Sequence, residues 1–127
     1  MKIYLAARWE SRISMQSFAT ALRQEGHEIV SFWHEGESNQ PLSVPDTPEK
    51  CIEEAIKNFN AITNCDVLIL YTMSGNGSQG AQVEFGYALG LRKRAIIFGK
   101  PINIFNYLAV VCKNWNELRM ELKKCDR

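Results

Sequence analysis

The sequence predicts a single α/β domain built on a parallel sheet of four to five strands, with helices on both faces. Short apolar runs of strand length alternate with amphipathic stretches at helical spacing along the whole chain. Because the runs are continuously apolar, we expect both faces of the sheet to be buried. Strict alternation with right-handed crossovers is typical of a flavodoxin- or Rossmann-like sheet. With 127 residues, no repeat and no linker, the chain is expected to form one domain over residues 1–127.

Five stretches carry the strand signal, and four carry the helix signal. The expected strands are residues 2–7, 28–33, 67–71, 95–99 and, as a short fifth strand, 107–111. The expected helices cover residues 13–25, 48–63, the stretch that contains Glu84 up to Arg94, and 115–124. Gly26 is a natural stop for the first helix. Asp46 and Glu49 form a capping-box pattern at the start of the second.

Composition excludes several functional classes. The net charge of +1 gives no basic excess for binding a nucleic-acid polymer. No apolar stretch approaches the ~20 residues of a membrane span, and the first residues lack a signal peptide, so we expect a cytoplasmic protein. The four cysteines form no CxxC pair, so we expect reduced thiols and no metal site.

A ligand site is expected beyond the carboxyl ends of the strands, as in other open parallel sheets. The segments that emerge there hold aromatic, cationic and small polar side chains, which suit a ligand with a flat ring and an anionic group. They include Arg8, Arg12, Trp33, Tyr71, Ser78 and Asn103.

The stretch from Met73 to Lys93 stands out, because a loop rich in glycine and serine leads into a small, apolar helix. Such a helix start favours an anion, although a plain flexible turn is the alternative interpretation. Glu84 lies about one turn into this helix, among apolar neighbours. A partly desolvated carboxylate beside an aromatic pocket can attack an electron-poor sugar carbon. Alternatively, it pairs with Arg8 or Arg12, or caps backbone N–H groups.

Four stretches together resemble the nucleoside 2-deoxyribosyltransferase superfamily, in order and over nearly the whole chain. They are IYLAARWESR, NCDVLILY, the run from Gly80 to Arg94, and WNEL. The most specific part is Gly80-xxx-Glu84-Phe85-Gly86-Tyr87-Ala88. The resemblance implies that Glu84 is the nucleophile toward C1′ of a 2′-deoxynucleoside. It also implies that Asp66 orients the site or handles the proton on the base.

Two departures from the family pattern favour a hydrolase of 2′-deoxynucleoside 5′-monophosphates, or a divergent relative, over a nucleoside transferase. Ser78 stands six residues before Glu84, where transferases tend to have an aspartate, and the hydrolase branch uses a serine there for phosphate. The C-terminal residues also do not resemble the carboxylate-bearing tail of the transferases. Arg8 and Arg12 are then candidate phosphate ligands, while solvated surface arginines are the alternative.

The resulting hypothesis is an enzyme that cleaves or transfers an N-glycosidic bond of a nucleoside or nucleotide, without metal or redox cofactor. Asp66, or Tyr4 and Tyr71, would assist departure of the base. Two alternatives remain: a non-catalytic nucleotide-binding sensor or defence module, and a domain that binds a protein partner. The resemblance also implies a homodimer or larger homo-oligomer, with residues 85–91 and 102–108 as candidate interface surface.

Overall fold

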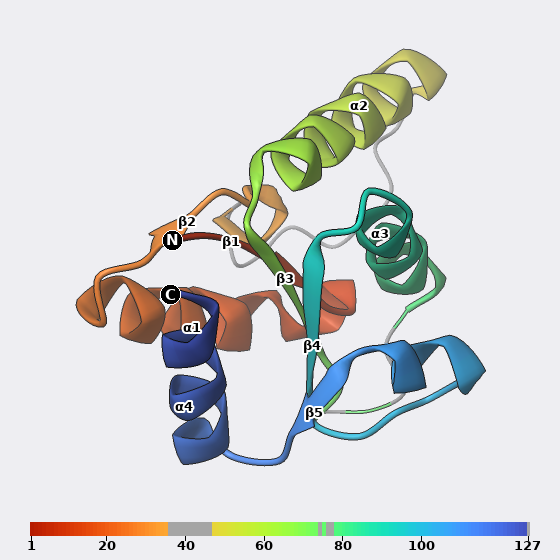
Figure 1. Cartoon of the computed structure of the whole chain (residues 1–127). Helices are drawn as coiled ribbons and strands as arrows, with labels where there is room; N and C mark the ends of the chain where they lie inside the picture. Colours follow the sequence, from red (N-terminus) through yellow and green to blue (C-terminus); the bar gives the residue numbers. More distant parts are fainter. Residues whose placement is uncertain (36–46, 74, 76–77, 127) are drawn as a thin grey trace.

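The protein contains one five-stranded parallel sheet, seen in a computed structural model that describes residues 1–35, 47–73, 75 and 78–126 (Figure 1). The strand order is β2-β1-β3-β4-β5, which is the flavodoxin-like order, so the predicted fold class is confirmed. The strands are β1 Lys2–Ala6, β2 Glu28–Ile29, β3 Val67–Tyr71, β4 Arg94–Phe98 and β5 Val110–Cys112.

The central strands are continuously apolar because helices bury both of their faces. Along β1, Ile3 and Leu5 face one core cluster while Tyr4 and Ala6 face the other. Strands β3 and β4 alternate in the same way, and the register pairs Leu5 with Ile69 and Ile69 with Ile96. A parallel strand covered on both faces has no position for a polar side chain, which explains the unbroken apolar runs.

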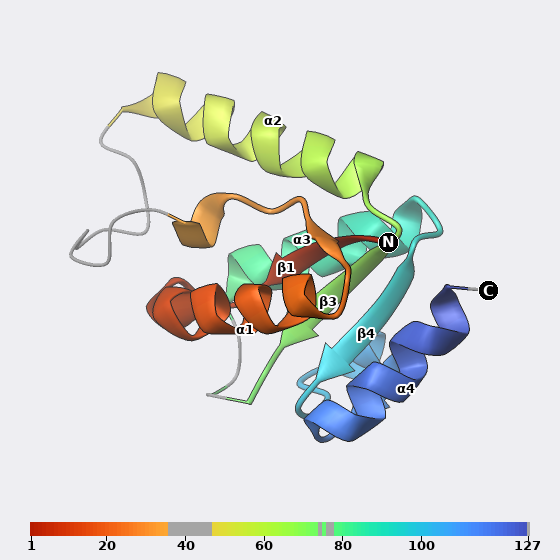
Figure 2. The same cartoon turned by 90° about the vertical axis from the view of Figure 1, so that its left-hand side faces the viewer.

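One face of the sheet is covered by α1 (Arg12–Gln24) and α4 (Trp115–Cys125), as Figures 1 and 2 show. Met15, Ala19 and Leu22 recur at helical spacing on α1 and are buried. The helix ends before Gly26, which has φ +94°, as the sequence predicted. Asn114 caps α4 by accepting a hydrogen bond from the Glu117 N–H at 2.9 Å.

The other face is covered by α2 (Pro48–Asn64) and α3 (Gln79–Gly90). Helix α2 reaches beyond the edge of the sheet (Figure 2) and buries only Ala61 and Ile62 fully, near its carboxyl end. The two helices meet where the Phe59 and Tyr87 rings stack at a centroid distance of 4.1 Å.

Three elements differ from the sequence prediction. Strand β2 ends at Ile29, not residue 33, and Trp33 begins a short 3-10 helix, η2 (Trp33–Glu35). The expected fifth strand is displaced, because Asn103 caps another 3-10 helix, η3 (Ile104–Leu108), before β5 begins at Val110. The side chain that caps α2 is Thr47, which accepts from the Lys50 N–H, whereas Asp46 lies outside the described residues.

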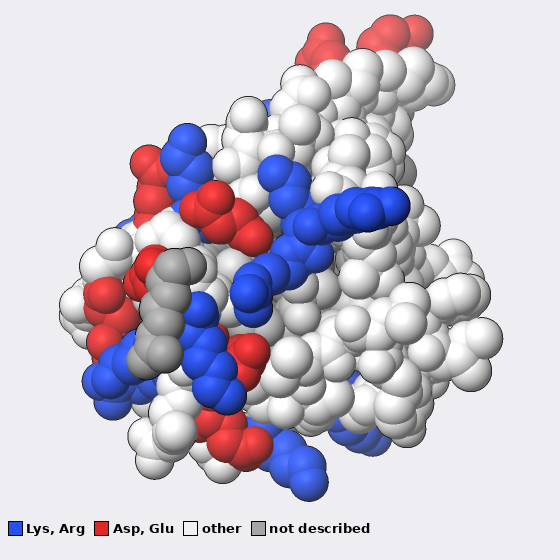
Figure 3. Space-filling model, in the orientation of Figure 1, with Lys and Arg blue, Asp and Glu red and all other residues white. Residues whose placement is uncertain are grey.

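Cys65 and Cys112 are buried thiols in the core of the described structure. None of the helices in the described ranges is long and apolar enough to cross a membrane. Charged side chains gather on one side of the face in Figure 3, while the side over α3 and η3 shows a wide uncharged area.

Candidate active site

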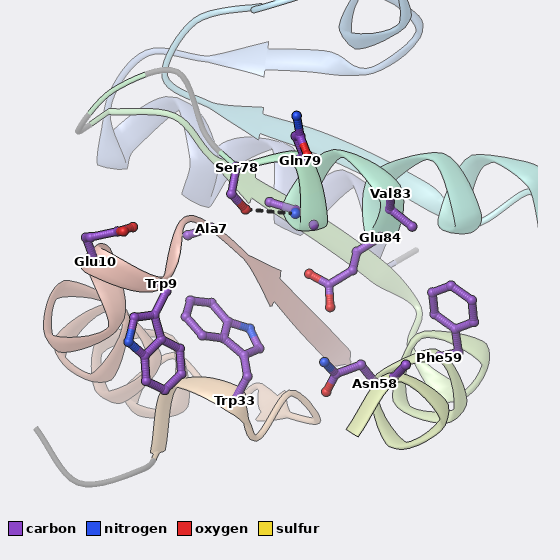
Figure 4. Close-up of a pocket in the computed structure, with 13 residues that line it drawn as sticks. Ala7, Trp9, Glu10, Trp33, Asn58, Phe59, Ser78, Gln79, Val83 and Glu84 are labelled. Atoms are coloured by element: carbon purple, nitrogen blue, oxygen red, sulfur yellow. Dashed lines mark hydrogen bonds between the residues drawn. The ribbon is translucent and has the colours of Figure 1, made fainter. Parts of the chain in front are cut away.

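A cavity of about 710 Å³ lies at the carboxyl end of β1, between the loops after β1 and β2 and the helices α2 and α3 (Figure 4). Its volume is in the range of small-molecule sites. Three of the residues predicted from the sequence to bind a ligand, and the predicted nucleophile, line it. The lining residues are Ala7, Trp9, Glu10, Trp33, Ala55, Asn58, Phe59, Ser78, Gln79, Gly80, Ala81, Val83 and Glu84.

Glu84 points into this cavity from the second turn of α3 (Figure 4). The buried Tyr4 hydroxyl, from β1, donates a hydrogen bond to Glu84 Oε2. Burial raises the pKa of Glu84 from 4.5 to about 7, although the Tyr4 hydrogen bond opposes that rise. Burial, with the Glu84 charge beside it, raises the pKa of Tyr4, so the phenol stays protonated and remains the donor. The pair therefore presents a carboxyl group that ionises near neutral pH, with one oxygen held in place.

The start of α3 forms the rim next to Glu84. Ser78 is the N-cap, and its Oγ accepts from the Ala81 N–H at 3.0 Å. Gly80 follows in the first turn and lines the cavity. Gly75, at φ +140°, packs against Arg8, since a Cβ built there would lie 2.9 Å from Arg8 Nη1. The Arg8 guanidinium therefore lies against Gly75, which follows β3.

Two indole rings form the opposite wall (Figure 4). Trp9 and Trp33 lie with ring centroids 6.4 Å apart at an interplanar angle of 42°. The Arg12 guanidinium lies 4.9 Å from the Trp9 ring centroid, a cation–π contact on the aromatic ring. Arg12 therefore supports the wall and is not among the lining residues.

Asn58 and Glu10 line the cavity and were not predicted from the sequence. Asn58 lies on α2, and Figure 4 shows its amide facing the cavity across from Glu84. The available signal was its place beside Ala55 and Phe59, on the edge of the apolar stripe of α2. Glu10 lies at the far end and pairs with Arg8 at 3.3 Å. Hydrogen bonding to its own backbone N–H, with Arg8 nearby, lowers the pKa of Glu10.

Three predicted site residues lie away from the cavity. Asp66 is at the amino end of β3, where it accepts a hydrogen bond from the Lys2 N–H at 2.8 Å. Tyr71 packs between Phe18 and Phe98 on the α1 and α4 face of the sheet. Asn103 caps η3 and donates to Gln82 Oε1 at 3.1 Å. The polar stretch 34–47 is longer than most connections in compact domains, so the sequence also predicts a loop that covers a site, and residues 36–46 of it lie outside the described residues.

Two solved structures are similar to this chain over most of their length. One is a 2-deoxyribosyltransferase from Bacillus psychrosaccharolyticus, with a TM-score of 0.76 and 21% identity over 93% of this chain and 90% of that one. The other is a CMP N-glycosidase of Clostridium botulinum, with a TM-score of 0.60 and 18% identity over 97% of this chain and 98% of that one. This chain has their fold. No protein-family model and no curated protein sequence matches it.

The site thus combines four features in one cavity: a carboxyl group that ionises near pH 7, a phenol donor, an indole wall and a carboxamide. An aromatic wall suits a flat ring, and the carboxylate oxygen not held by Tyr4 is available to an electrophile. No group of three His, Cys, Asp or Glu side chains that would hold a metal ion occurs among the residues described.

Proposed function

We propose that this protein cleaves, by hydrolysis or transfer, the N-glycosidic bond of a nucleoside or nucleotide, with Glu84 as nucleophile. The observation that carries the proposal is the Tyr4–Glu84 pair inside an aromatic-walled cavity at the ligand edge of the sheet. The two neighbours that share the fold, a 2-deoxyribosyltransferase and a CMP N-glycosidase, support the same bond.

The proposed reaction uses the two oxygens of the Glu84 carboxylate differently. Tyr4 holds Oε2, so Oε1 of the ionised Glu84 attacks C1′. The C1′–N bond breaks, its electron pair goes to the base nitrogen, and a glycosyl ester forms on Glu84. The base takes up a proton as it leaves, and attack at C1′ by water or by a second base then frees Glu84. Trp33 supplies a flat surface for the leaving ring, and Asn58 supplies both a donor and an acceptor across from Glu84.

The residues at the rim of the cavity support a 2′-deoxynucleoside 5′-monophosphate as the substrate. The Ser78 hydroxyl and the N–H groups of the first turn of α3 lie on one side, and the Arg8 guanidinium lies beside Gly75. Helix starts and arginine side chains both favour phosphate. Arg8→Gln is therefore expected to raise KM for a monophosphate about tenfold and to leave KM for the matching nucleoside within about twofold. Equal effects on both substrates would remove Arg8 from phosphate binding.

The decisive experiment measures free base released from dCMP, dGMP and deoxyadenosine by the wild type, Glu84→Gln and Glu10→Gln. Glu10 is the matched control, since it is the other carboxylate on the described lining. Loss of the nucleophile is expected to lower kcat by a factor of about 10³ or more, while Glu10→Gln stays within a few-fold. Base release by Glu84→Gln at the wild-type rate would refute the role of Glu84.

A nucleotide-binding sensor is the second candidate. The observation that favours it is that the described lining offers no carboxylic acid near Glu84 to protonate a departing base, since Asn58 is a neutral amide and Asp66 lies elsewhere. Calorimetric titration with the same three ligands separates the two functions. Tight binding with no base release would support the sensor, and turnover would exclude it.

A second copy of this chain is the partner that the surface favours. Ile52 and Ile56 on α2 and Val83 on α3 are more than half exposed, and so are most residues of the apolar segment around η3. Large exposed apolar areas mark interfaces. Val83 and Ala55 also line the cavity, so a copy seated on α2 and α3 would close it. Light scattering is expected to give a dimer or larger assembly for the wild type and a monomer for Ile56→Glu/Val83→Glu; a wild-type monomer would refute this.

A further inference from the structure

The edge of β1 facing β2 is completed by side chains instead of backbone. Backbone pairing ends with the Val30 N–H donating to the Ile3 carbonyl at 2.9 Å. The next peptide groups of β1 to need partners belong to Leu5. Its N–H donates to Ser31 Oγ at 3.1 Å, and its carbonyl accepts from Trp33 Nε1 at 2.6 Å. These two contacts explain why β2 is short, because side chains satisfy the groups that a longer strand would pair.

Ser31 is itself held in place by a buried histidine. Ser31 Oγ lies 2.8 Å from His34 Nε2, and both side chains are completely buried. The His34 carbonyl accepts from Gln16 Nε2 at 2.7 Å, which ties the segment to α1. The His34 ring also packs edge-on against the Trp33 indole at a centroid distance of 5.3 Å. The hydroxyl, the imidazole and the indole therefore form one connected cluster on the edge of β1.

The same strand carries the support of the nucleophile. Tyr4, one residue before Leu5, donates to Glu84 on the opposite face of β1. The Trp33 indole and the Glu84 carboxylate are thus each hydrogen-bonded to one of two consecutive residues of β1, Leu5 and Tyr4. The only hydrogen-bond donor of the Trp33 indole is bonded to the Leu5 carbonyl. The indole therefore contacts a ligand through its apolar face and edges and offers it no hydrogen bond.

We infer that Ser31 and His34 are positioning residues that hold the Trp33 indole on β1 and so fix the gap between the aromatic wall and Glu84. The claim that a ligand's planar ring fills this gap rests on the proposed function. The contacts within the cluster do not depend on that function. Tightly packed interiors transmit small displacements. Loss of the contacts that hold the Trp33 indole would therefore weaken the binding of a ligand's flat ring against it.

The first test reads the cluster without any ligand, by NMR hydrogen exchange of the Trp33 indole N–H. The protein has three tryptophans, and the Trp33 resonance is assigned by its loss in Trp33→Phe. Ser31→Ala is expected to speed this exchange about tenfold or more, and Ser31→Thr, which keeps the hydroxyl, to restore it. Should Ser31→Ala fail to fold, His34→Gln carries the same test, because it removes the imidazole and keeps a polar side chain.

The matched control is Asn114→Ala, which removes the cap of α4 on the other side of the sheet and weakens the fold without touching the cluster. It is expected to leave the Trp33 exchange within about twofold. Wild-type exchange in Ser31→Ala, or equal acceleration in Asn114→Ala, would overturn the inference.

The second test reads the site. Ser31→Ala is expected to raise KM for the preferred nucleotide about tenfold, with kcat within about threefold, while Asn114→Ala changes neither. A lower kcat with unchanged KM would overturn the inference, because the indole would then not be set for binding. If the wild type releases no base, the proposed function fails, and the exchange experiment still decides whether Ser31 and His34 hold the indole.

Discussion

Tyr4→Phe isolates the effect of one hydrogen bond on the pKa of Glu84. Tyr4 is fully buried, and phenylalanine keeps its ring in the core while removing only the hydroxyl that donates to Glu84 Oε2. The pKa of Glu84 stands at about 7 because burial raises it and this hydrogen bond opposes the rise. A hydrogen bond to a charged group is worth about 1.5–3 kcal/mol, and each pKa unit corresponds to about 1.36 kcal/mol. The pKa of Glu84 in Tyr4→Phe is therefore expected at about 8–9.

The assay is the rate of base release between pH 5 and 10. For a nucleophile, activity rises as Glu84 ionises, so the wild-type profile climbs to a plateau above about pH 7. The midpoint for Tyr4→Phe is expected one to two units higher, with a loss of about 5- to 50-fold at pH 7 and recovery toward wild type near pH 10. Tyr71→Phe is the control, because Tyr71 packs on the other face of the sheet. An unmoved midpoint in Tyr4→Phe, or a wild-type rate that falls as Glu84 ionises, would refute the reasoning.

Three further predictions concern stability and the residues outside the cavity. The pKa of Glu84 is higher in the folded chain than its ordinary value of 4.5, so its ionisation in the folded state costs stability. This cost is absent below about pH 4.5, grows up to pH 7 and is complete above it. Glu84→Gln is therefore expected to raise the free energy of unfolding by up to about 3 kcal/mol at pH 8 and to leave it unchanged at pH 4, measured by urea unfolding. A gain of the same size at both pH values would contradict this. Asp66→Asn weakens the bond to the Lys2 N–H, so it is expected to cost about 1 kcal/mol of unfolding free energy with kcat/KM within twofold, and a hundredfold loss of activity would return Asp66 to the site. Gly99→Ala is expected to lose about 3 kcal/mol or more, because φ is +135° and the added Cβ would lie 2.3 Å from Thr72 Oγ1 and within 3 Å of backbone; a melting temperature equal to wild type would disprove it.

The fold was predictable because its strongest signals are local. The apolar runs of β1, β3 and β4 are unbroken, and α1 and α2 carry apolar stripes at helical spacing. The end of β2 was not predictable, since it depends on Ser31 and Trp33 side chains that replace backbone partners on a distant strand. The periodicity of apolar residues indicates which face of a segment is buried. It does not indicate which side chains will hydrogen-bond to the backbone of a neighbouring strand.

The candidate site was predictable where a residue's place followed from strand direction. Glu84, Ser78 and Gly80 follow β3 and Trp33 follows β2, so all four reach the carboxyl edge. Asp66 precedes β3 and therefore lies at the amino end of this strand. The prediction that placed it in the site came from the family resemblance and did not use the direction of the strand. Asn58 lies on α2 and faces the cavity because α2 packs against α3. This tertiary contact leaves no pattern in the local sequence.

The alternation of β1 divides its side chains into two sets. Tyr4 and Ala6 belong to the cluster beneath the cavity, whereas Ile3 and Leu5 belong to the cluster under α1 and α4. Trp33 of the cavity wall packs against both clusters, so it is the point at which the two layers meet. Substitutions at Ile3 or Leu5 would reach the cavity through this indole, whereas substitutions at Tyr4 would reach it directly through Glu84. A five-residue strand therefore has two routes, one on each face, by which a change in core packing alters the candidate site.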